Sequence, residues 1–189
     1  MKFTVARETL LKPLQLVTGV VERRQTLPVL ANVLLVLEKD QLSLTGTDLE
    51  VEIVGRLNLE GDVREGEITV PAKKFLDICK ALPEGSMIEF VQEEQKVVVK
   101  SGRSRFSLST LPANDFPAVE ESAKDLSFEC PQKDIKTLIE KTSFSMAQQD
   151  VRYYLNGMLW EIRSNTMRVV ATDGHRLAMC TKDVGADVS

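Results

Sequence analysis

The segment Leu44-Thr45-Gly46-Thr47-Asp48 decides the fold, because its pattern returns 125 residues later as Val169-Val170-Ala171-Thr172-Asp173. At this offset the apolar residues of the two stretches also align, and the alignment needs no gap: Leu14, for example, meets Ile139. A repeat reports architecture before any single motif does, and this period is far too long for a solenoid. The sequence therefore predicts that each copy is a domain.

The two copies predict one whole domain at residues 1–124 and part of a second at 125–189, which stops about halfway through the repeat. In the first copy we expect helices at 7–20 and 71–82 and strands at 2–5, 29–38, 41–45, 50–59, 66–70, 87–91, 96–100 and 103–109. In the second copy we expect a helix at 131–142 and strands at 126–130, 155–162, 167–171 and 176–182. Chain reversals are expected at Gly46-Thr47-Asp48 and Ser101-Gly102, and a linker at 111–124. Short connections favour antiparallel pairing, so the predicted class is α+β, with two helices on one face of antiparallel sheet.

The composition is that of a mildly acidic globular protein. The 189 residues include 43% hydrophobic residues and carry a formal net charge of −4. This excludes a uniformly basic nucleic-acid-binding tail but allows a local basic face. The three cysteines are far apart and odd in number, which predicts reduced thiols: Cys79, Cys130 and Cys180. With no signal peptide and no apolar run of membrane-spanning length, we expect a cytoplasmic protein without a membrane partner.

Cations recur at equivalent places in the two copies. On the first helix Arg7 and Lys12 lie off the apolar stripe, and on the second Lys136 does so together with Lys133 and Lys141. Two equivalent basic helices favour contact with DNA phosphates without sequence readout, although an ordinary solvated helix surface is the alternative. Tyr153 and Tyr154 are candidates for stacking on bases or a peptide, or for burial in a strand.

Two groups of polar residues allow a catalytic or metal-binding hypothesis. Asp173 and His175 invite an enzymatic interpretation, but no nucleophile with an orienting partner is visible, and a turn between strands is the competing explanation. Asp48, Glu50 and Glu52 alternate along an expected strand and so share one face, which could hold a metal ion, although a solvated strand face is the favoured interpretation. His175 is the only histidine, so this chain offers no two-histidine metal site, and we expect no metal and no cofactor.

Three longer motifs carry a family resemblance. They are Leu42–Glu50, Ser101–Pro112, and Val151–Met158 followed by Ala171–Ala178. They resemble the bacterial sliding clamps, the beta subunits of DNA polymerase III. The resemblance implies a DNA-clamp fold with three similar domains per subunit and two subunits joined head to tail around duplex DNA, bound independently of sequence. It implies a non-catalytic processivity factor whose partners are the replicative polymerase, the clamp loader and other proteins with clamp motifs. The third domain is absent from this sequence. An enzyme using Asp173 and His175, or an oligomeric scaffold without DNA, remain the alternatives.

The resemblance also implies three sets of site residues. Together with the charge pattern it gives a DNA-contacting set of Arg24, Gln149, Tyr153, Tyr154, Arg7, Lys12 and Lys136. The positions matching the family's peptide-binding pocket are Arg152, Leu155, Thr172, Gly174, His175, Arg176 and Leu177, of which the two leucines would form apolar walls. The positions matching the dimer interface, an edge strand and a nearby helix, are Lys74, Ile78, Leu82, Arg103, Arg105, Phe106 and Leu108.

Overall fold

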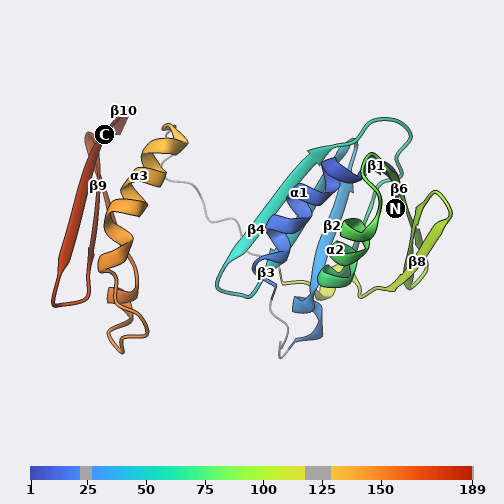
Figure 1. The fold of residues 1–189 in the computed structure, drawn as a ribbon, viewed down its shortest axis with the longest axis horizontal. Coiled ribbons are helices and arrows are strands. Elements are labelled where there is room, and N and C mark those ends of the chain that lie inside the picture. Colours follow the sequence, from blue (N-terminus) through green and yellow to red (C-terminus); the bar gives the residue numbers. More distant parts are fainter. Residues whose placement is uncertain (22–26, 118–128, 189) are drawn as a thin grey trace. The chain divides into compact units, whose positions relative to one another are not determined.

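The structure, a computed structural model, describes residues 1–21, 27–117 and 129–188. It divides into two compact units, Met1–Glu120 and Glu121–Ser189, and each is described by itself (Figure 1). The domain boundary predicted at 124/125 falls among residues 118–128, outside the described part of the chain. No helix among the described residues is long and apolar enough to cross a bilayer.

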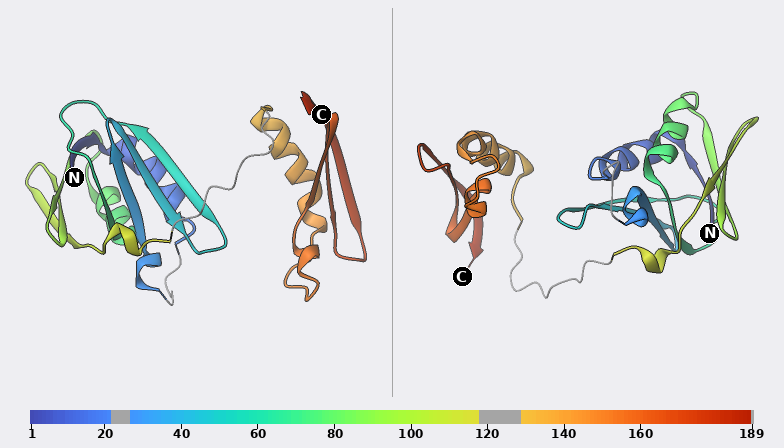
Figure 2. Two further views of the ribbon diagram at one scale, coloured as in Figure 1. Left: turned by 180° about the vertical axis from the view of Figure 1, so that it is seen from behind. Right: turned by 90° about the horizontal axis from the view of Figure 1, so that it is seen from below.

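In its described residues, unit 1 is built from two four-stranded antiparallel sheets and two α-helices. One sheet has the order β1-β6-β7-β8 and the other β4-β3-β2-β5. Its strands are β1 (Lys2–Ala6), β2 (Asn32–Glu38), β3 (Gln41–Thr47), β4 (Glu52–Asn58), β5 (Gly66–Pro71), β6 (Met87–Glu93), β7 (Lys96–Ser101) and β8 (Ser104–Ser109). Its helices are α1 (Arg7–Thr18) and α2 (Ala72–Ala81), with short 3-10 turns η1 (Pro28–Ala31) and η2 (Ala113–Asp115). Seen from behind, β2, β3 and β4 lie in front of both helices (Figure 2). The predicted α+β class is confirmed.

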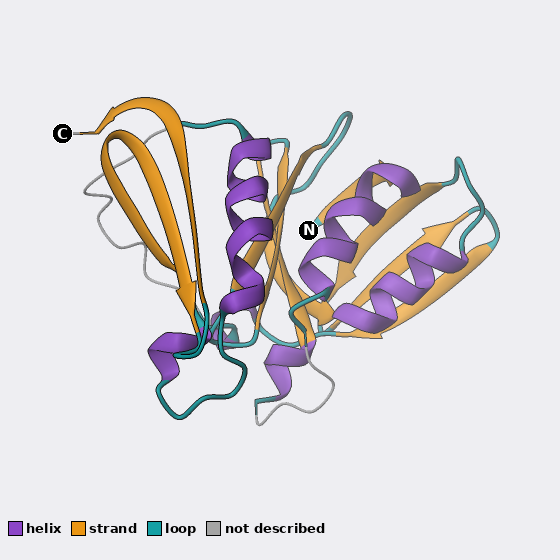
Figure 3. Ribbon diagram, turned by 60° about the vertical axis from the view of Figure 1, so that its left-hand side comes forward, coloured by secondary structure: helices purple, strands orange, loops and turns teal. Residues whose placement is uncertain are grey.

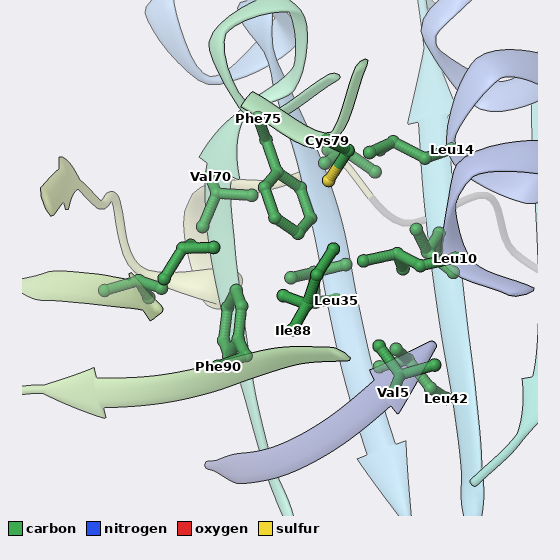
Figure 4. Packing of buried hydrophobic residues seen from close by; sticks show 14 of the residues in the cluster. Val5, Leu10, Leu14, Leu35, Leu42, Val70, Phe75, Cys79, Ile88 and Phe90 are labelled. Atoms are coloured by element: carbon green, nitrogen blue, oxygen red, sulfur yellow. The ribbon is translucent and has the colours of Figure 1, made fainter. Parts of the chain in front are cut away.

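Apolar side chains from both helices and both sheets of unit 1 meet in one core. Leu10 and Leu14 of α1 point toward Phe75 and Cys79 of α2 (Figure 4). Phe90 of β6 lies beneath them and stacks on Phe3, with ring centroids 4.7 Å apart. Burying each such side chain contributes roughly 1.5–3 kcal/mol, so the helices are held by their packed faces more than by helix propensity. Burial also raises the pKa of the Cys79 thiol to about 12, which keeps it protonated.

Two glycines let α1 lie very close to its sheet. A Cβ built on Gly46 would lie 2.4 Å from the carbonyl oxygen of Val17, and one built on Gly55 would lie 2.8 Å from the Cβ of Pro13. α1 therefore continues through Pro13, whose ring packs over the bare backbone of β4. The repeat places Ala171 and Cys180 at these two positions, so the second copy has side chains where the first has none.

Unit 2 contains α3 (Gln132–Thr142), the 3-10 turns η3 (Ser143–Ser145) and η4 (Tyr153–Asn156), and the antiparallel strands β9 (Leu159–Thr172) and β10 (Leu177–Val188) (Figure 3). The guanidinium of Arg168 lies 3.3 Å from the carboxylate of Glu161, seven residues earlier in β9. An extended strand separates residues seven apart by about 23 Å, so β9 folds back between them, as the two predicted strands require. α3 packs on β9 and β10 as α1 packs on β3 and β4, which agrees with the predicted equivalence of the two helices.

The predicted register of the two helices needs a correction of one residue. In α1 the hydroxyl of Thr18 donates to the carbonyl oxygen of Leu14, whereas in α3 that of Thr142 donates to Leu138. Leu138 is fully buried and Ile139 is 37% exposed. The offset is therefore 124 in the later part of the helix, and the gapless alignment is wrong there. The strands beneath α3 carry side chains, Ala171 and Cys180, at the positions where glycines let α1 lie close to its sheet.

Several predicted boundaries are also wrong. The strands expected to begin at Val29 and Leu155 start later, because both copies first form a 3-10 turn, η1 and η4, at the same offset of 125. Pro28 fixes the backbone at the start of η1. The reversals lie at 48–51 and 102–103 instead of at Gly46-Thr47-Asp48 and Ser101-Gly102. The strand expected at 126–130 falls mostly outside the described residues.

Candidate functional site

The turn that joins β9 to β10 is fixed by hydrogen bonds from its own side chains. The hydroxyl of Thr172 donates to the carbonyl oxygen of Arg176 over 2.7 Å and accepts from the amide of Gly174. One carboxylate oxygen of Asp173 accepts the amides of His175 and Arg176, each at 2.9 Å. Gly174 has φ 90°, a left-handed conformation that costs glycine nothing. The turn thus holds His175 and Arg176 at the surface.

The turn between β3 and β4 is the same structure 125 residues earlier. Thr47 donates to the carbonyl oxygen of Val51 and accepts the amide of Leu49. Asp48 accepts the amides of Glu50 and Val51 at 2.9 and 2.7 Å. The two turns therefore contain the same side-chain hydrogen bonds at equivalent positions of the repeat. Because the carboxylate of Asp48 accepts two backbone amides within a turn, the prediction that it shares a strand face with Glu50 and Glu52 is wrong.

A second fixed loop lies next to the turn of unit 2. The guanidinium of Arg152 donates twice to the carboxylate of Asp150, at 3.1 and 2.9 Å, and its backbone amide donates a third bond at 2.8 Å. These bonds, the guanidinium first, lower the pKa of Asp150 to about 2. Asn156 ties the loop off by accepting from the amide of Asp150 and donating to its carbonyl oxygen. Such bidentate pairs hold a guanidinium in one orientation.

The turn and the loop together line an open groove of about 520 Å³. Its walls are Met146, Ala147, Gln148, Gln149, Asp150, Arg152, Asp173, His175 and Arg176. Arg152 lies beside the turn, with its Nη1 atom 3.5 Å from where a Cβ on Gly174 would be. Arg176 pairs with Asp173 at 3.0 Å. Each arginine thus has a carboxylate partner, and the groove is polar with two oriented guanidinium groups at its surface.

The groove brings together part of the predicted peptide pocket. Arg152, His175 and Arg176 line it, and Thr172 and Gly174 shape the turn behind it. Leu155 is half-buried in η4 and Leu177 is 65% exposed in β10, and neither lines the groove. The described residues of unit 2 therefore supply a polar rim, while the predicted apolar walls are not assembled.

The enzymatic alternative has little support in this geometry. The carboxylate of Asp173 is occupied by two backbone amides and Arg176, which together hold its pKa below the usual value. His175 contributes its backbone amide to this turn, and its side chain is exposed. The part of the chain that the structure describes holds no cluster of three or more histidine, cysteine or carboxylate side chains suited to a metal ion.

The predicted DNA-contacting residues differ in how available they are. Tyr153 and Tyr154 are 81% and 67% exposed on η4, edge to face with centroids 6.0 Å apart, so the alternative of buried strand aromatics is wrong. Gln149 has a left-handed backbone, with φ 58°, and lines the groove. This predicted DNA-contacting residue therefore lies next to the predicted peptide pocket. Lys12 is exposed, whereas Lys136 pairs loosely with Glu140 at 3.7 Å. Arg24 lies outside the described residues.

Arg7 does not belong on a free cationic face. Its side chain is only 13% exposed, and its Nε donates to the carbonyl oxygen of Cys79 over 2.8 Å. A second bond, from Nη2, reaches the carbonyl oxygen of Lys80 at 3.3 Å. The last carbonyls of a helix lack partners within the helix and carry partial negative charge, so they attract this cation. The expectation that Arg7 faces solvent beside Lys12 is therefore wrong.

The predicted assembly surface combines an edge strand with a helix that packs against it. β8 is the edge of its sheet and contacts α2, as expected (Figure 1). Lys74, Arg103 and Arg105 are exposed. Ile78 and Phe106 are half-buried against the core, and Leu82 and Leu108 are each only 5% exposed. The last two lie largely in the domain's own core, and their direct contact with a partner stays a prediction.

The comparison with known families agrees with this geometry. Residues 1–120 match the model for the N-terminal domain of the DNA polymerase III beta subunit, and residues 129–188 match the model for its central domain. The chain belongs to this family. The two matches meet close to where the structure divides into its two units.

Individual relatives of the beta-subunit family are close. The chain is 68% identical over 183 residues to the beta sliding clamp of Pseudomonas aeruginosa and 57% identical over 185 residues to that of Escherichia coli K12. A crystal structure of the Pseudomonas aeruginosa subunit matches with a TM-score of 0.95 and 67% identity, covering 97% of this chain and 50% of that one. The matches cover 97% and 98% of this chain but 50% of each sliding clamp, so the chain spans about half the length of these relatives.

Sequence reasoning missed several residues that make the groove. Asp150, which orients Arg152, was not singled out, nor were Met146 and Ala147. The Asp-x-Arg spacing at 150–152 was the available signal, because an aspartate can accept from the backbone two residues on. Met146 and Ala147 carry no such signal, since their place depends on how η3 and η4 fold back on one another.

Proposed function

We propose that this chain is the N-terminal half of a ring-shaped sliding clamp that encircles duplex DNA and tethers the replicative polymerase. The observation that carries the proposal is the match to two consecutive beta-subunit domains, in order, along the chain. The repeated Thr-Asp turn supports it, because a ring of similar domains needs the same unit built more than once. The protein acts without catalysis, cofactor or metal, in the cytoplasm.

In the proposed mechanism, retention of the DNA does not depend on direct contacts with it. Enclosure by the closed ring holds the DNA, so each contact stays weak and independent of sequence. Gln149, Tyr153 and Tyr154 are suited to such contacts, because they project from one exposed segment of unit 2. Lys12, Lys136 and Arg24 complete the proposed DNA-contacting set. The mildly acidic remainder of the surface discourages indiscriminate binding to nucleic acid.

The polymerase, the clamp loader and other partners would bind through short peptides at the groove of unit 2. Arg152, His175 and Arg176 line it, and their fixed loops present hydrogen-bond donors before a peptide arrives. Preorganised donors reduce the entropy lost on binding. Leu155 and Leu177 lie outside this groove, and we propose that they form an apolar part of the pocket together with later residues of the complete protein.

The subunits would join through β8 and α2. An edge strand offers unpaired backbone donors and acceptors to a strand of the partner. Lys74, Arg103 and Arg105 are exposed beside it and would meet an acidic face, while Ile78 and Phe106 offer partly exposed apolar surface. Two subunits of three domains each would then close the ring.

The function is tested by processive synthesis. The complete three-domain protein, supplied with its clamp loader and replicative polymerase on primed single-stranded circles, is expected to lengthen the products made in one binding event. Omitting the clamp loader is the matched control and should leave products short. Equal product lengths with and without the protein would contradict the proposal.

The DNA-contacting set is tested separately by salt dependence. In the complete protein, Arg24→Ala should weaken binding to primed DNA and reduce the slope of log K against log salt by about 0.9, the value for one phosphate contact. Gln149→Ala removes no charge, so it should weaken binding modestly without changing the slope. Unchanged affinity of both variants at every salt concentration would exclude these loops from the DNA face.

A further inference from the structure

We propose that Arg7 and Glu8 act as a positioning clip for subunit assembly rather than as DNA contacts. The clip holds the end of α2 and the turn at 83–86 against the start of α1. The inference rests on the proposed function, because it assumes that β8 and α2 form the subunit interface. It assigns a role to two charged residues that the DNA face and the groove leave unexplained.

The side chains of Arg7 and Glu8 reach the end of α2 and the turn that follows it. Arg7 donates to the carbonyl oxygens of Cys79 and Lys80, the last turn of α2. Glu8 accepts from Nη1 of Arg7 and from the backbone amide of Gly85, each at 3.0 Å. The amide of Gly85 is the main reason that the pKa of Glu8 lies below its usual value. One ion pair thus bridges a helix end and the turn that follows it.

Backbone contacts complete the same junction. The amide of Arg7 donates to the carbonyl oxygen of Ser86 over 2.9 Å. Within the turn, the hydroxyl of Ser86 donates to the carbonyl oxygen of Pro83 over 2.7 Å. The turn is therefore attached to α1 through the backbone of Arg7, the side chain of Glu8 and its own internal bonds. An arginine is suited to this task, because its planar fork can reach two carbonyls and a carboxylate at once.

The junction connects α2 to the sheet that ends in β8. α2 ends at Ala81 and β6 begins at Met87, so the clipped turn is the connection between them. β6 pairs with β7, and β7 pairs with the edge strand β8. α2 therefore ends at the clip, and β8 is joined to the clip through β6 and β7. Without the clip, α2 could rotate and shift Lys74 and Ile78 relative to β8. Such a shift would weaken subunit association, because the two surfaces of an interface must be complementary in shape.

The second copy lacks the two charged residues of the clip. At the offset of 125, Gln132 and Lys133 replace Arg7 and Glu8. Neither can repeat the arrangement, since glutamine has no charge and lysine cannot accept a hydrogen bond. The clip is therefore specific to the first copy, which is also the copy proposed to carry the subunit interface.

The test uses the complete three-domain protein. We expect Arg7→Ala to weaken subunit association about tenfold, measured by subunit exchange with fluorescently labelled protein, which is the loss expected for one charge-assisted hydrogen bond. Arg7→Lys keeps the charge but reaches fewer acceptors, so it should recover part of the affinity. Glu8→Gln should weaken association less than Arg7→Ala. The salt slope of DNA binding should stay unchanged in all three variants.

Lys12→Ala on the same helix is the matched control. It should leave association unchanged and reduce the salt slope. A thermal unfolding scan of each variant identifies a temperature at which its domain is folded, and association is measured at that temperature. Association of Arg7→Ala within twofold of the unsubstituted protein would overturn the clip, as would a salt slope reduced as much as by Lys12→Ala. If the unsubstituted protein forms no dimer at all, the proposed function fails instead.

Discussion

At the scale of single residues, the groove of unit 2 depends on carboxylates that orient arginines. Asp150 fixes Arg152, and Asp173 fixes both the turn and Arg176. Because these carboxylates are bonded in the folded state, they stay ionised well into acid. The two guanidinium groups therefore keep their orientation across the physiological pH range, and a partner peptide meets a fixed pattern of donors.

The Asp150–Arg152 pair gives a pH prediction. The pKa of Asp150 is lowered to about 2 from an ordinary value of 3.8, so the pair stabilises the folded loop above pH 4 and this contribution is lost as pH falls toward 2. We expect the Asp150 carboxyl to titrate near pH 2 by carbon-13 NMR. In Arg152→Ala the pKa should move only part of the way back, because the backbone amide of residue 152 still donates. Arg176→Ala is the control and should leave it in place. Titration of Asp150 near 3.8 in the unsubstituted protein would contradict the geometry.

Leu49 gives a second prediction at this scale. Its φ of 79° is left-handed, and the second copy has Gly174 at the same place in the turn. Leu49→Gly should be more stable than Leu49→Ala by about 1 kcal/mol, because the left-handed conformation costs residues with a Cβ roughly 1–2 kcal/mol. Both variants lose the same exposed side chain, so the comparison isolates the backbone. Urea unfolding followed by circular dichroism measures it, and equal stabilities would refute the strain.

At the scale of elements, the two copies use the same parts with different packing. The turn at 47–51 and the 3-10 turn η1 recur 125 residues later with the same hydrogen bonds. The helices differ in register, and so do the strand positions beneath them: Gly46 and Gly55 admit α1 closely, whereas the second copy has Ala171 and Cys180 at these positions. The two copies thus differ both in side-chain volume at two strand positions and in the helix residues that are buried.

The corrected register of α3 predicts unequal effects for two neighbouring residues. Leu138→Ala should cost about 2–5 kcal/mol of unfolding free energy, since Leu138 is fully buried. Ile139→Ala should cost about 1 kcal/mol or less, because that side chain is substantially exposed. Chemical denaturation of the complete protein, monitored at Trp160 in unit 2, compares them. A larger loss for Ile139→Ala would restore the gapless alignment.

Much of the fold could be predicted from the sequence, for reasons that particular elements show. Strands β3 to β8 alternate or run apolar between strong turn signals, and for β3 and β4 the repeat supported the prediction with a second copy. The 3-10 turns were missed because Val29–Ala31 and Leu155–Asn156 have apolar patterns that fit a strand equally well. Arg7 was misassigned because its acceptors, the carbonyls of Cys79 and Lys80, lie 72 and 73 residues away. No local pattern reports such a contact.

At the scale of the whole molecule, residues 1–120 match the N-terminal domain model of the family, residues 129–188 match the central domain model, and the chain spans about half the length of its relatives. The proposed ring needs the later residues. We therefore predict that an isolated 1–189 polypeptide is monomeric or aggregates, because β8 would lack its partner strand and unit 2 would expose apolar side chains such as Leu159, Leu177 and Met179. Light scattering decides its size, and a discrete dimer that stays on circular DNA would contradict the prediction.

The central claim is that DNA is held by enclosure, and retention on DNA of different topology tests it most directly. The complete three-domain protein is loaded onto a nicked circular plasmid and passed over a sizing column at high salt, and the same sample is then cut once with a restriction enzyme. Enclosure predicts that the protein stays with the circle and is lost from the linear DNA by sliding off its ends. Equal retention on both forms, or equal loss from both at the same salt concentration, would show that ordinary surface contacts hold the DNA and would contradict the account.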